Sequence, residues 1–400
     1  MRKLLKHIPA FASDTVWTAG GFLILNLCLQ ALIYPQWTEV LGNEGSGNVL
    51  YLVAFTDIFA VTMGTACSYA RLKESVGGDP GRASYTVVLA AAGIAALPLC
   101  FLIARGNPAT PDTAACLLYF LVTVLRMIRY WGMVFFNLRK DYRGMFLYHL
   151  VISAGFALGY ALFARTGLWA LSLLPGEALG VVYLLLRDRT PRGRISPILI
   201  RSCLLLALSY LISNVFYNAD KLILKNLVSA EAVTIFQLSA WGGRVMSLLA
   251  SSVDAVLIGY LARKQETPDG RSILRLGVLS LAAALVLSLG AFMVSMVWIR
   301  LRYAYNYALV SPYFLPSNAA YAVFFVTEVV TVFLLRYCPS RLQVYVNLVF
   351  LLGFVLCMLC TSRFGLNGFI LSFLVLNLIR LVSALLLGWH FLLRRSRAAS

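Results

Sequence analysis

Long apolar runs, separated by short stretches of glycine, proline and charged residues, dominate this chain of 400 residues. Several runs exceed about 18 residues, the length of a membrane-crossing helix, and they do not alternate as barrel strands do. In lipid, every backbone N–H and C=O group must be bonded within the structure, so runs of this kind form helices. The chain is 60% apolar and only 12% charged, unlike a soluble domain. We therefore predict an all-α integral membrane protein.

Twelve spans account for the apolar runs, and loops such as GGDPGR and RDRTPRGR mark the gaps between them. Lys and Arg gather in alternate loops and in both terminal segments, so the positive-inside rule places both termini in the cytoplasm. The first apolar segment has no A-x-A cleavage site, and we expect it to be retained as a span. The predicted spans are approximately 15–35, 49–70, 84–104, 114–136, 144–164, 167–186, 198–218, 233–261, 273–299, 311–335, 343–361 and 365–388.

Charge and cysteine usage exclude several functions. The formal net charge is +18, but the basic residues lie in short clusters between apolar runs, without finger spacing, so we expect no nucleic acid partner. Most of the eight cysteines lie inside apolar runs, where the CxxC spacing of Cys357 and Cys360 favours packing over metal or redox chemistry. His7, His149 and His390 are scattered. We predict no cofactor, no metal site and no direct use of ATP, because a GxxxxGK[ST] loop is absent.

The loops also bear on catalysis. None is long enough for a separate domain, and none carries paired acidic or histidine motifs. Membrane glycosyltransferases, polymerases and ligases usually have such a loop or domain, so we do not predict an enzyme. A membrane-embedded glycan polymerase or ligase stays an alternative, as does a scaffold in a polysaccharide assembly complex.

An internal repeat is indicated by two segments that align without gaps. Residues 40–55 (VLGNEGSGNVLYLVAF) lie on residues 226–241 (NLVSAEAVTIFQLSAW), and each segment passes through a small, acidic turn into an apolar helix. Transporters are often built from such repeats. We predict two six-helix bundles, an N-terminal one over residues 1–190 and a C-terminal one over residues 191–400.

These segments resemble a known family. YPQWTEVLGNEGSGNVLYLVAF is similar to the first loop of polysaccharide transporters in the multidrug/oligosaccharidyl-lipid/polysaccharide (MOP) exporter superfamily, where Pro, Leu-Gly and acidic-x-x-Gly precede the second span. SNVFYNADKLILKNLVSAEAVTIFQLSA is similar to the seventh-span pattern, with Asp220, Lys221, Leu222 and Leu224 at matching positions. Twelve spans with cytoplasmic termini resemble the Wzx-type flippases of O-antigen and capsule units.

The resemblance implies a flippase of the bacterial cytoplasmic (inner) membrane. Its substrate would be a polyprenyl-diphosphate-linked oligosaccharide, moved from the cytoplasmic to the outer leaflet for O-antigen, lipopolysaccharide or capsule biosynthesis. The two bundles would alternate access to a central cavity, with ion coupling as an option. Membrane lipids, a polysaccharide polymerase and chain-length proteins are further candidate partners. A small-molecule exporter of the same superfamily stays the alternative, although a basic interior favours anionic cargo.

Ionisable residues inside the spans are the candidate site, because charge at that depth costs about 2.5–3.5 kcal/mol and is retained for a reason. A guanidinium group donates two parallel hydrogen bonds to phosphate oxygens. We predict substrate binding by Arg126, Arg129, Arg244 and Arg380, with structural ion pairs between helices as the alternative. Four carboxyls either couple transport to ions, with Asp57 and Glu328 leading, or neutralise arginines: Asp57, Glu177, Asp254 and Glu328.

A last pair, Asp220 and Lys221, stands at the outer end of the seventh span. Adjacent residues on a helix point about 100° apart, so we do not expect these two to bond to each other. We predict a structural role for them, at the end of the span or at an outer gate.

Overall fold

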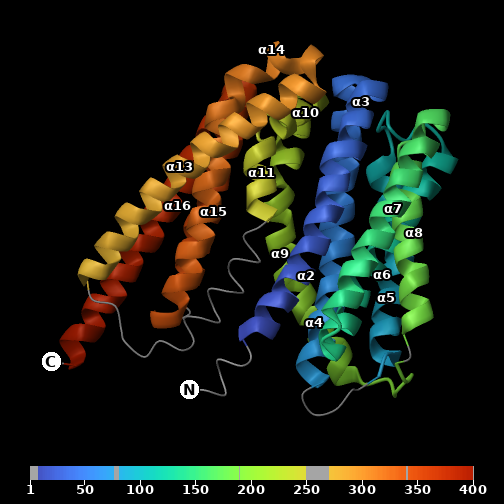
Figure 1. The fold of residues 1–400 in the computed structure, drawn as a ribbon, viewed down its shortest axis with the longest axis horizontal. Coiled ribbons are helices and arrows are strands. Elements are labelled where there is room, and N and C mark those ends of the chain that lie inside the picture. The colour runs from blue at the N-terminus through green and yellow to red at the C-terminus, as the bar shows by residue number, and fades with distance from the viewer. Residues whose placement is uncertain (1–7, 76–80, 189, 249–269, 339–340, 400) are drawn as a thin grey trace. The chain divides into compact units, whose positions relative to one another are not determined.

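The computed structural model describes residues 8–75, 81–188, 190–248, 270–338 and 341–399, and the regular structure in these ranges is helical (Figure 1). The helices up to residue 227 are α2 (Ile8–Cys28), η1 (Leu29–Ile33), α3 (Tyr34–Thr56), η2 (Asp57–Val61), α4 (Thr62–Glu74), α5 (Ala83–Ala104), α6 (Thr113–Arg139), α7 (Tyr142–Thr166), α8 (Ala170–Arg187) and α9 (Pro197–Leu227). The later helices are α10 (Ala230–Ser239), α11 (Trp241–Leu248), α13 (Gly270–Arg302), η4 (Ala304–Asn306), α14 (Tyr307–Val310), η5 (Ser311–Tyr313), α15 (Phe314–Tyr337) and α16 (Arg341–Ala399).

Two of the helical stretches, Val16–Glu74 and Leu348–Phe391, are each long enough for two spans, and each is bent at a glycine. Gly42 in α3 has φ of 70° and Gly365 in α16 has φ of 60°, a left-handed conformation that glycine adopts without strain. Within the described residues, nine segments are long and apolar enough to span a membrane, and the two bent ones each overlap two of the predicted spans. The predicted eighth span, 233–261, contains α10 and α11 and then passes into residues outside the described ranges. The all-α, multi-pass prediction is confirmed.

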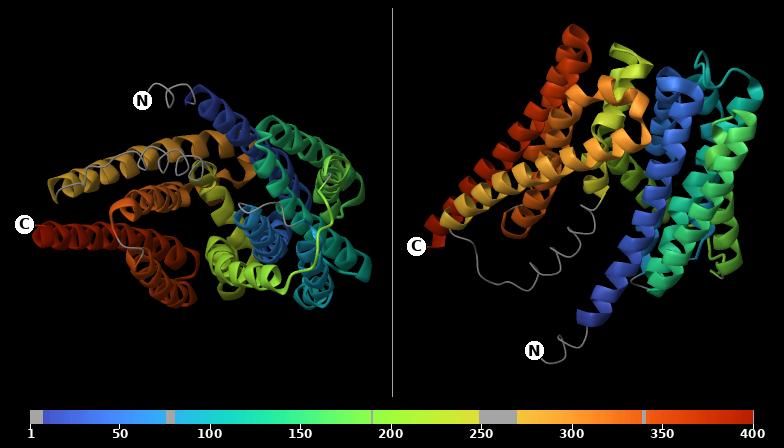
Figure 2. Two further views of the ribbon diagram at one scale, coloured as in Figure 1. Left: turned by 90° about the horizontal axis from the view of Figure 1, so that it is seen from below. Right: turned by 45° about the horizontal axis from the view of Figure 1, so that its top comes forward.

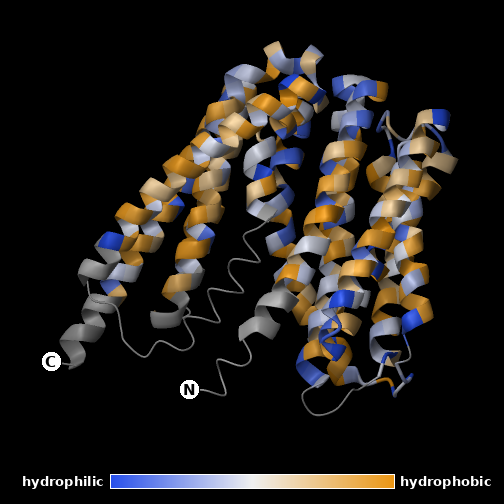
Figure 3. Ribbon diagram, in the orientation of Figure 1, coloured by the Kyte–Doolittle hydropathy of each residue, from blue (hydrophilic) through white to orange (hydrophobic). Residues whose placement is uncertain are grey.

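Internal contacts divide the chain into two compact units, Met1–Lys225 and Asn226–Ser400. In this division α9, which contains the predicted seventh span, belongs with the first unit. The proposed boundary between residues 190 and 191 stays a prediction. Hydrophobic residues run along the helices of both units (Figure 3), and many large ones are exposed; Ile94, Leu186 and Leu301 are each more than 75% exposed. Such surfaces suit contact with lipid rather than water.

In the first unit, glycines let helices approach closely. A Cβ atom at Gly155 of α7 would lie 2.5 Å from Cα of Gly176 in α8. A Cβ atom at Gly64 of α4 would lie 2.5 Å from the carbonyl oxygen of Met127 in α6. Small residues at crossings of this kind are typical of membrane helices. The crossing at Gly64 matters most, because it fixes the part of α6 that carries the buried arginines.

The second unit is organised around α13, α15 and α16, which run side by side (Figures 1 and 2). Val330 and Leu334 of α15 pack with Leu381 and Ala384 of α16 in a buried apolar cluster, and Ala284 of α13 joins them. This packing positions one face of α15 against the last part of α16. The charged pair described below also joins these two helices.

Candidate functional site

The first charged cluster is built on one face of α6. Arg126 and Arg129 are three positions apart and therefore share a face, and both are buried. Glu177 of α8 is fully buried between them. Its Oε1 accepts a hydrogen bond of 2.8 Å from Nε of Arg126, and its Oε2 lies 2.7 Å from Nε of Arg129. One carboxylate thus bridges both arginines.

Asp57 completes this cluster from η2. Its Oδ1 accepts a hydrogen bond of 2.6 Å from Nη1 of Arg126. The Arg126 side chain is 4% exposed, whereas that of Asp57 is 30% exposed. Two positive and two negative groups balance, which is the condition under which charges are tolerated in a low-dielectric interior. Asp57 is the most exposed member of the cluster.

The backbone around Asp57 is irregular. Residues Asp57–Val61 form one π-helical turn, a feature that often occurs at functional sites. The hydroxyls of Thr56 and Thr123 lie 3.2 Å apart and tie this segment to α6. On the other side of the cluster, Tyr148 Oη donates to the carbonyl oxygen of Arg129 at 3.3 Å. The four charged side chains are therefore held from three helices.

A second ion pair lies in the second unit. Nη1 of Arg380 in α16 is 2.7 Å from Oε1 of Glu328 in α15. The guanidinium stands over two aromatic rings, 4.6 Å from the centre of Phe350 and 5.4 Å from that of Phe324. As in the first unit, the arginine is the buried partner at 7% exposure and the carboxylate the accessible one at 23%. Cation–π contacts add to the stability of such a site.

Arg244 lies beside a helix break in the second unit. Its guanidinium is 5.0 Å from the ring centre of Tyr321 and 5.4 Å from that of Phe236. The break between α10 and α11 is stabilised by Asn318, whose Oδ1 accepts from Gly243 N at 2.7 Å. Asn318 Nδ2 donates to the Ser239 carbonyl at 2.8 Å. Asp254, a predicted ion-coupling residue, lies outside the described residues.

The candidate charged residues of both units lie in even-numbered predicted spans. These are the second, fourth and sixth spans, and then the eighth, tenth and twelfth. In chain order, the first unit has Asp57, Arg126 and Glu177, and the second has Arg244, Glu328 and Arg380. The structure joins the first three directly and pairs Glu328 with Arg380. Three of the predicted substrate-binding arginines are therefore paired with carboxylates, Arg126 and Arg129 in the first unit and Arg380 in the second. The fourth, Arg244, lies against the rings of Tyr321 and Phe236.

The remaining predicted residues and one missed residue lie on α9. Asp220 is buried, and Lys221 Nζ donates to Asn218 Oδ1 at 2.8 Å. Sequence reasoning missed Lys225, whose Nζ donates to Asn48 Oδ1 and lies 6.0 Å from the ring centre of Tyr51. No local motif marks this contact, because the two residues are far apart in the chain.

Known proteins with a similar architecture are found among solved structures. No protein-family model and no curated protein sequence matches the chain. Among solved structures, the lipid II flippase MurJ in an inward closed conformation superposes with a TM-score of 0.69 at 12% identity, covering 94% of this chain and 87% of that one. An inward-facing multidrug resistance MATE family transporter of the MOP superfamily gives 0.67 at 13% identity, covering 95% and 100%. The chain has the fold of the MOP superfamily transporters.

The MOP fold is shared by proteins with different cargo. A further match, a MOP superfamily transporter from Pyrococcus furiosus, has a TM-score of 0.60 at 15% identity and covers 94% of both chains. For that protein, a reverse polarity of the binding pocket suggests a different function. The fold therefore identifies the architecture of this chain, and its charged residues must carry any argument about its substrate.

Proposed function

We propose that this protein is a MOP superfamily transporter that flips a polyprenyl-diphosphate-linked oligosaccharide from the cytoplasmic to the outer leaflet by alternating access. The MOP fold supports transport, and the lipid II flippase among its structural neighbours supports a lipid-linked cargo. One observation supports an anionic headgroup on the cargo. In each unit, a buried intramembrane arginine is held by a carboxylate that is several times more exposed than the arginine itself.

This arrangement suits anion exchange. Carboxylate and phosphate oxygens accept the same charge-assisted hydrogen bonds from a guanidinium. A diphosphate that approaches from the accessible side meets Asp57 before Arg126, and it reaches the guanidinium by displacing the carboxylate. The exchange replaces one anion by another, so Arg126 is not left as an unpaired charge in low dielectric. Glu328 and Arg380 offer the same exchange in the second unit.

The displaced carboxyl group couples transport of the lipid-linked cargo to the binding and release of an ion. Once the diphosphate occupies Arg126, Asp57 stands without its cation in a membrane-embedded site. A proton or another cation that binds Asp57 restores the balance of charge, and it leaves when the arginine recaptures the carboxylate. Intramembrane carboxyls commonly serve as relays of this kind. Asp57 and Glu328 are the exchanging groups, and the fully buried Glu177 is the fixed counter-charge.

A second candidate is an exporter of small cationic molecules. The accessible members of both ion pairs are acids, and an acid at the accessible end of a pair attracts cations. The MATE family transporter named above is a multidrug resistance transporter of the same fold. In that case transport depends on Asp57 and Glu328, and the arginines serve only to orient them.

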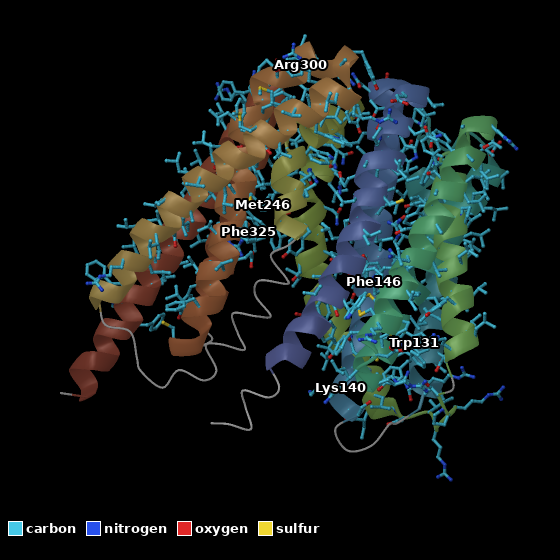
Figure 4. The ribbon with its side chains drawn as sticks, in the orientation of Figure 1. Trp131, Lys140, Phe146, Met246, Arg300 and Phe325 are labelled. Atoms are coloured by element: carbon cyan, nitrogen blue, oxygen red, sulfur yellow. The ribbon has the colours of Figure 1, made fainter. Side chains whose placement is uncertain are left out.

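Genetic complementation separates the two candidates. A bacterial strain that lacks its own repeat-unit flippase, supplied with the native glycan pathway of this protein, receives the wild type, Arg126→Gln or Arg380→Gln. We expect the wild type to restore surface glycan and both variants to trap lipid-linked units at the inner leaflet. Arg300→Gln is the matched control, because Arg300 is exposed at the end of α13 (Figure 4). Failure of the wild type to restore export, at confirmed membrane expression, contradicts the proposed function.

A further inference from the structure

A basic pocket lies in the first unit, apart from the ion cluster. It is a cavity of about 300 Å³ at the ends of α4 and α6, closed on one side by the segment that follows α8. Its walls combine polar and apolar groups: Arg71, Phe135, Leu138, Arg139, Thr190 and Pro191. None of the four residues of the Asp57 cluster contributes to it. The pocket is therefore a separate site.

Backbone hydrogen bonds fix the outer wall of this pocket. Arg82 N donates to the carbonyl oxygen of Arg192 at 3.0 Å, and Ala83 N donates to the same oxygen at 2.7 Å. From inside the pocket, Nη2 of the buried Arg71 donates to Thr190 Oγ1 at 3.0 Å. A Cβ atom at Gly81 would lie 2.7 Å from Cα of Gly193, so the two backbones are in direct contact. The wall is preformed rather than a loose loop.

The charge in the pocket comes from arginines. Arg139 is exposed at the end of α6, and its Cζ atom lies 4.1 Å from the ring centre of Phe135. Among the described residues, no carboxylate lies within 4.0 Å of the Arg139 guanidinium. Lys140 follows it at the same end of the unit (Figure 4). The pocket thus presents a guanidinium that rests on an aromatic ring and can accept an anion.

The surroundings indicate where this anion comes from. Ile195 and Ile198, next to the wall segment, are 62% and 77% exposed, and Leu186 is also exposed. Exposed aliphatic side chains beside arginines are typical of the boundary between lipid tails and headgroups. The positive-inside pattern predicts that this end faces the cytoplasm. Basic pockets between membrane helices on that side bind anionic headgroups.

We propose that this pocket binds the phosphate of an anionic phospholipid from the cytoplasmic leaflet. Arg139 contacts the phosphate, Arg71 supplies charge from the floor, and the exposed Ile195 and Ile198 contact the start of the acyl chains. The bound lipid contacts both the end of α6 and the segment before α9. It therefore connects the fixed wall of the pocket to the membrane surface. This site is independent of the proposed function, which concerns the ion pairs deeper in the spans.

Lipid binding by the purified full-length protein tests this site. Native mass spectrometry measures retention of dioleoylphosphatidylglycerol and of dioleoylphosphatidylcholine, each titrated separately. We expect phosphatidylglycerol to bind more tightly, and Arg139→Gln to weaken its binding about fivefold, the effect of one basic residue near a membrane surface. Arg275→Gln removes the same charge from an exposed position of α13 that is also predicted to be cytoplasmic. Its binding should match the wild type within about twofold.

Three results would overturn the proposal. Equal retention of the two lipids would show that the headgroup charge is not recognised. Equal losses for Arg139→Gln and Arg275→Gln would show a diffuse attraction without a site. Displacement of phosphatidylglycerol by inorganic phosphate at equal concentration would show a site for a free anion. Arg139→Lys is the conservative variant, and it should retain more phosphatidylglycerol than Arg139→Gln because it keeps the charge.

Discussion

Nε of Arg126 lies 2.8 Å from Oε1 of Glu177, so a charge-assisted hydrogen bond joins the fourth and sixth spans of the first unit inside the membrane. Glu177 also faces Arg129 at 2.7 Å, and the helices enclose it completely. The carboxylate therefore contacts both guanidinium groups, and Asp57 supplies the second negative charge of the cluster through Arg126. This bond makes the cluster a structural unit as well as a candidate site.

Glu177→Gln keeps the shape of the side chain but leaves Asp57 as the one carboxylate of the cluster. We expect a loss of stability of about 3–5 kcal/mol, the usual cost of breaking a buried pair. Thermal unfolding in detergent, followed by tryptophan fluorescence, measures it. Asp141→Asn is the control, because the Asp141 pair with Arg187 is exposed and should contribute less than about 1 kcal/mol. Equal effects of the two variants would contradict the role of Glu177.

The Asp57→Asn substitution tests whether Asp57 couples transport to ions, separately from any effect on folding. Asp57 is the accessible member of the cluster, and Glu177 still neutralises Arg126 in this variant. We expect the protein to accumulate normally and its transport in proteoliposomes to become insensitive to an imposed proton gradient. Glu231→Gln, at an exposed position of α10, is the control and should respond as the wild type does. If Asp57→Asn keeps the wild-type response, Asp57 is not the exchanging group.

Gly64→Ala tests the crossing that positions the cluster. The added methyl group would stand 2.5 Å from the Met127 carbonyl oxygen and 2.7 Å from Cβ of Tyr130. Because both belong to α6, the helices must separate, and we expect a loss of about 1–3 kcal/mol. Gly290→Ala meets no atom within 4 Å and should be neutral or stabilising by up to about 1 kcal/mol. The unfolding temperatures of the two variants should move in opposite directions or differ by several degrees, and equal shifts would refute tight packing at Gly64.

Arg380→Lys tests the aromatic platform of the second unit. Lysine keeps the charge that Glu328 requires, but it loses the planar group that stacks over Phe350 and Phe324. We expect about 0.5–2 kcal/mol lower stability and weaker export of lipid-linked units. Arg300→Lys, at an exposed position of α13, provides a charge-conserving control. Wild-type export by Arg380→Lys would show that charge alone is needed there.

The sequence predicted the helical spans well because long apolar runs have one solution in lipid. It also identified nearly all of the buried charges, since each interrupts an apolar run. It could not predict their partners. Arg126 meets Asp57 and Glu177, which are 69 and 51 positions away, and only the packing of α6 against η2 and α8 brings them together.

Local breaks in the helical backbone could not be predicted from the sequence either. The π-helical turn Asp57–Val61 contains no proline or glycine to mark it. The break before Trp241 depends on Asn318, which lies 75 residues beyond Gly243. Such breaks depend on tertiary contacts, which cannot be predicted from the periodicity of a single apolar segment.

The central claim is that buried arginines carry an anionic lipid-linked cargo, and flipping by the purified protein tests it most directly. Proteoliposomes loaded with a polyprenyl-diphosphate-linked oligosaccharide are treated from outside with periodate, and the protected fraction of glycan is followed with time. We predict that the wild type and Arg300→Gln expose the protected pool, while Arg126→Gln and Arg380→Gln leave it protected. If the arginine variants flip the lipid at the wild-type rate, the anion-exchange account is wrong.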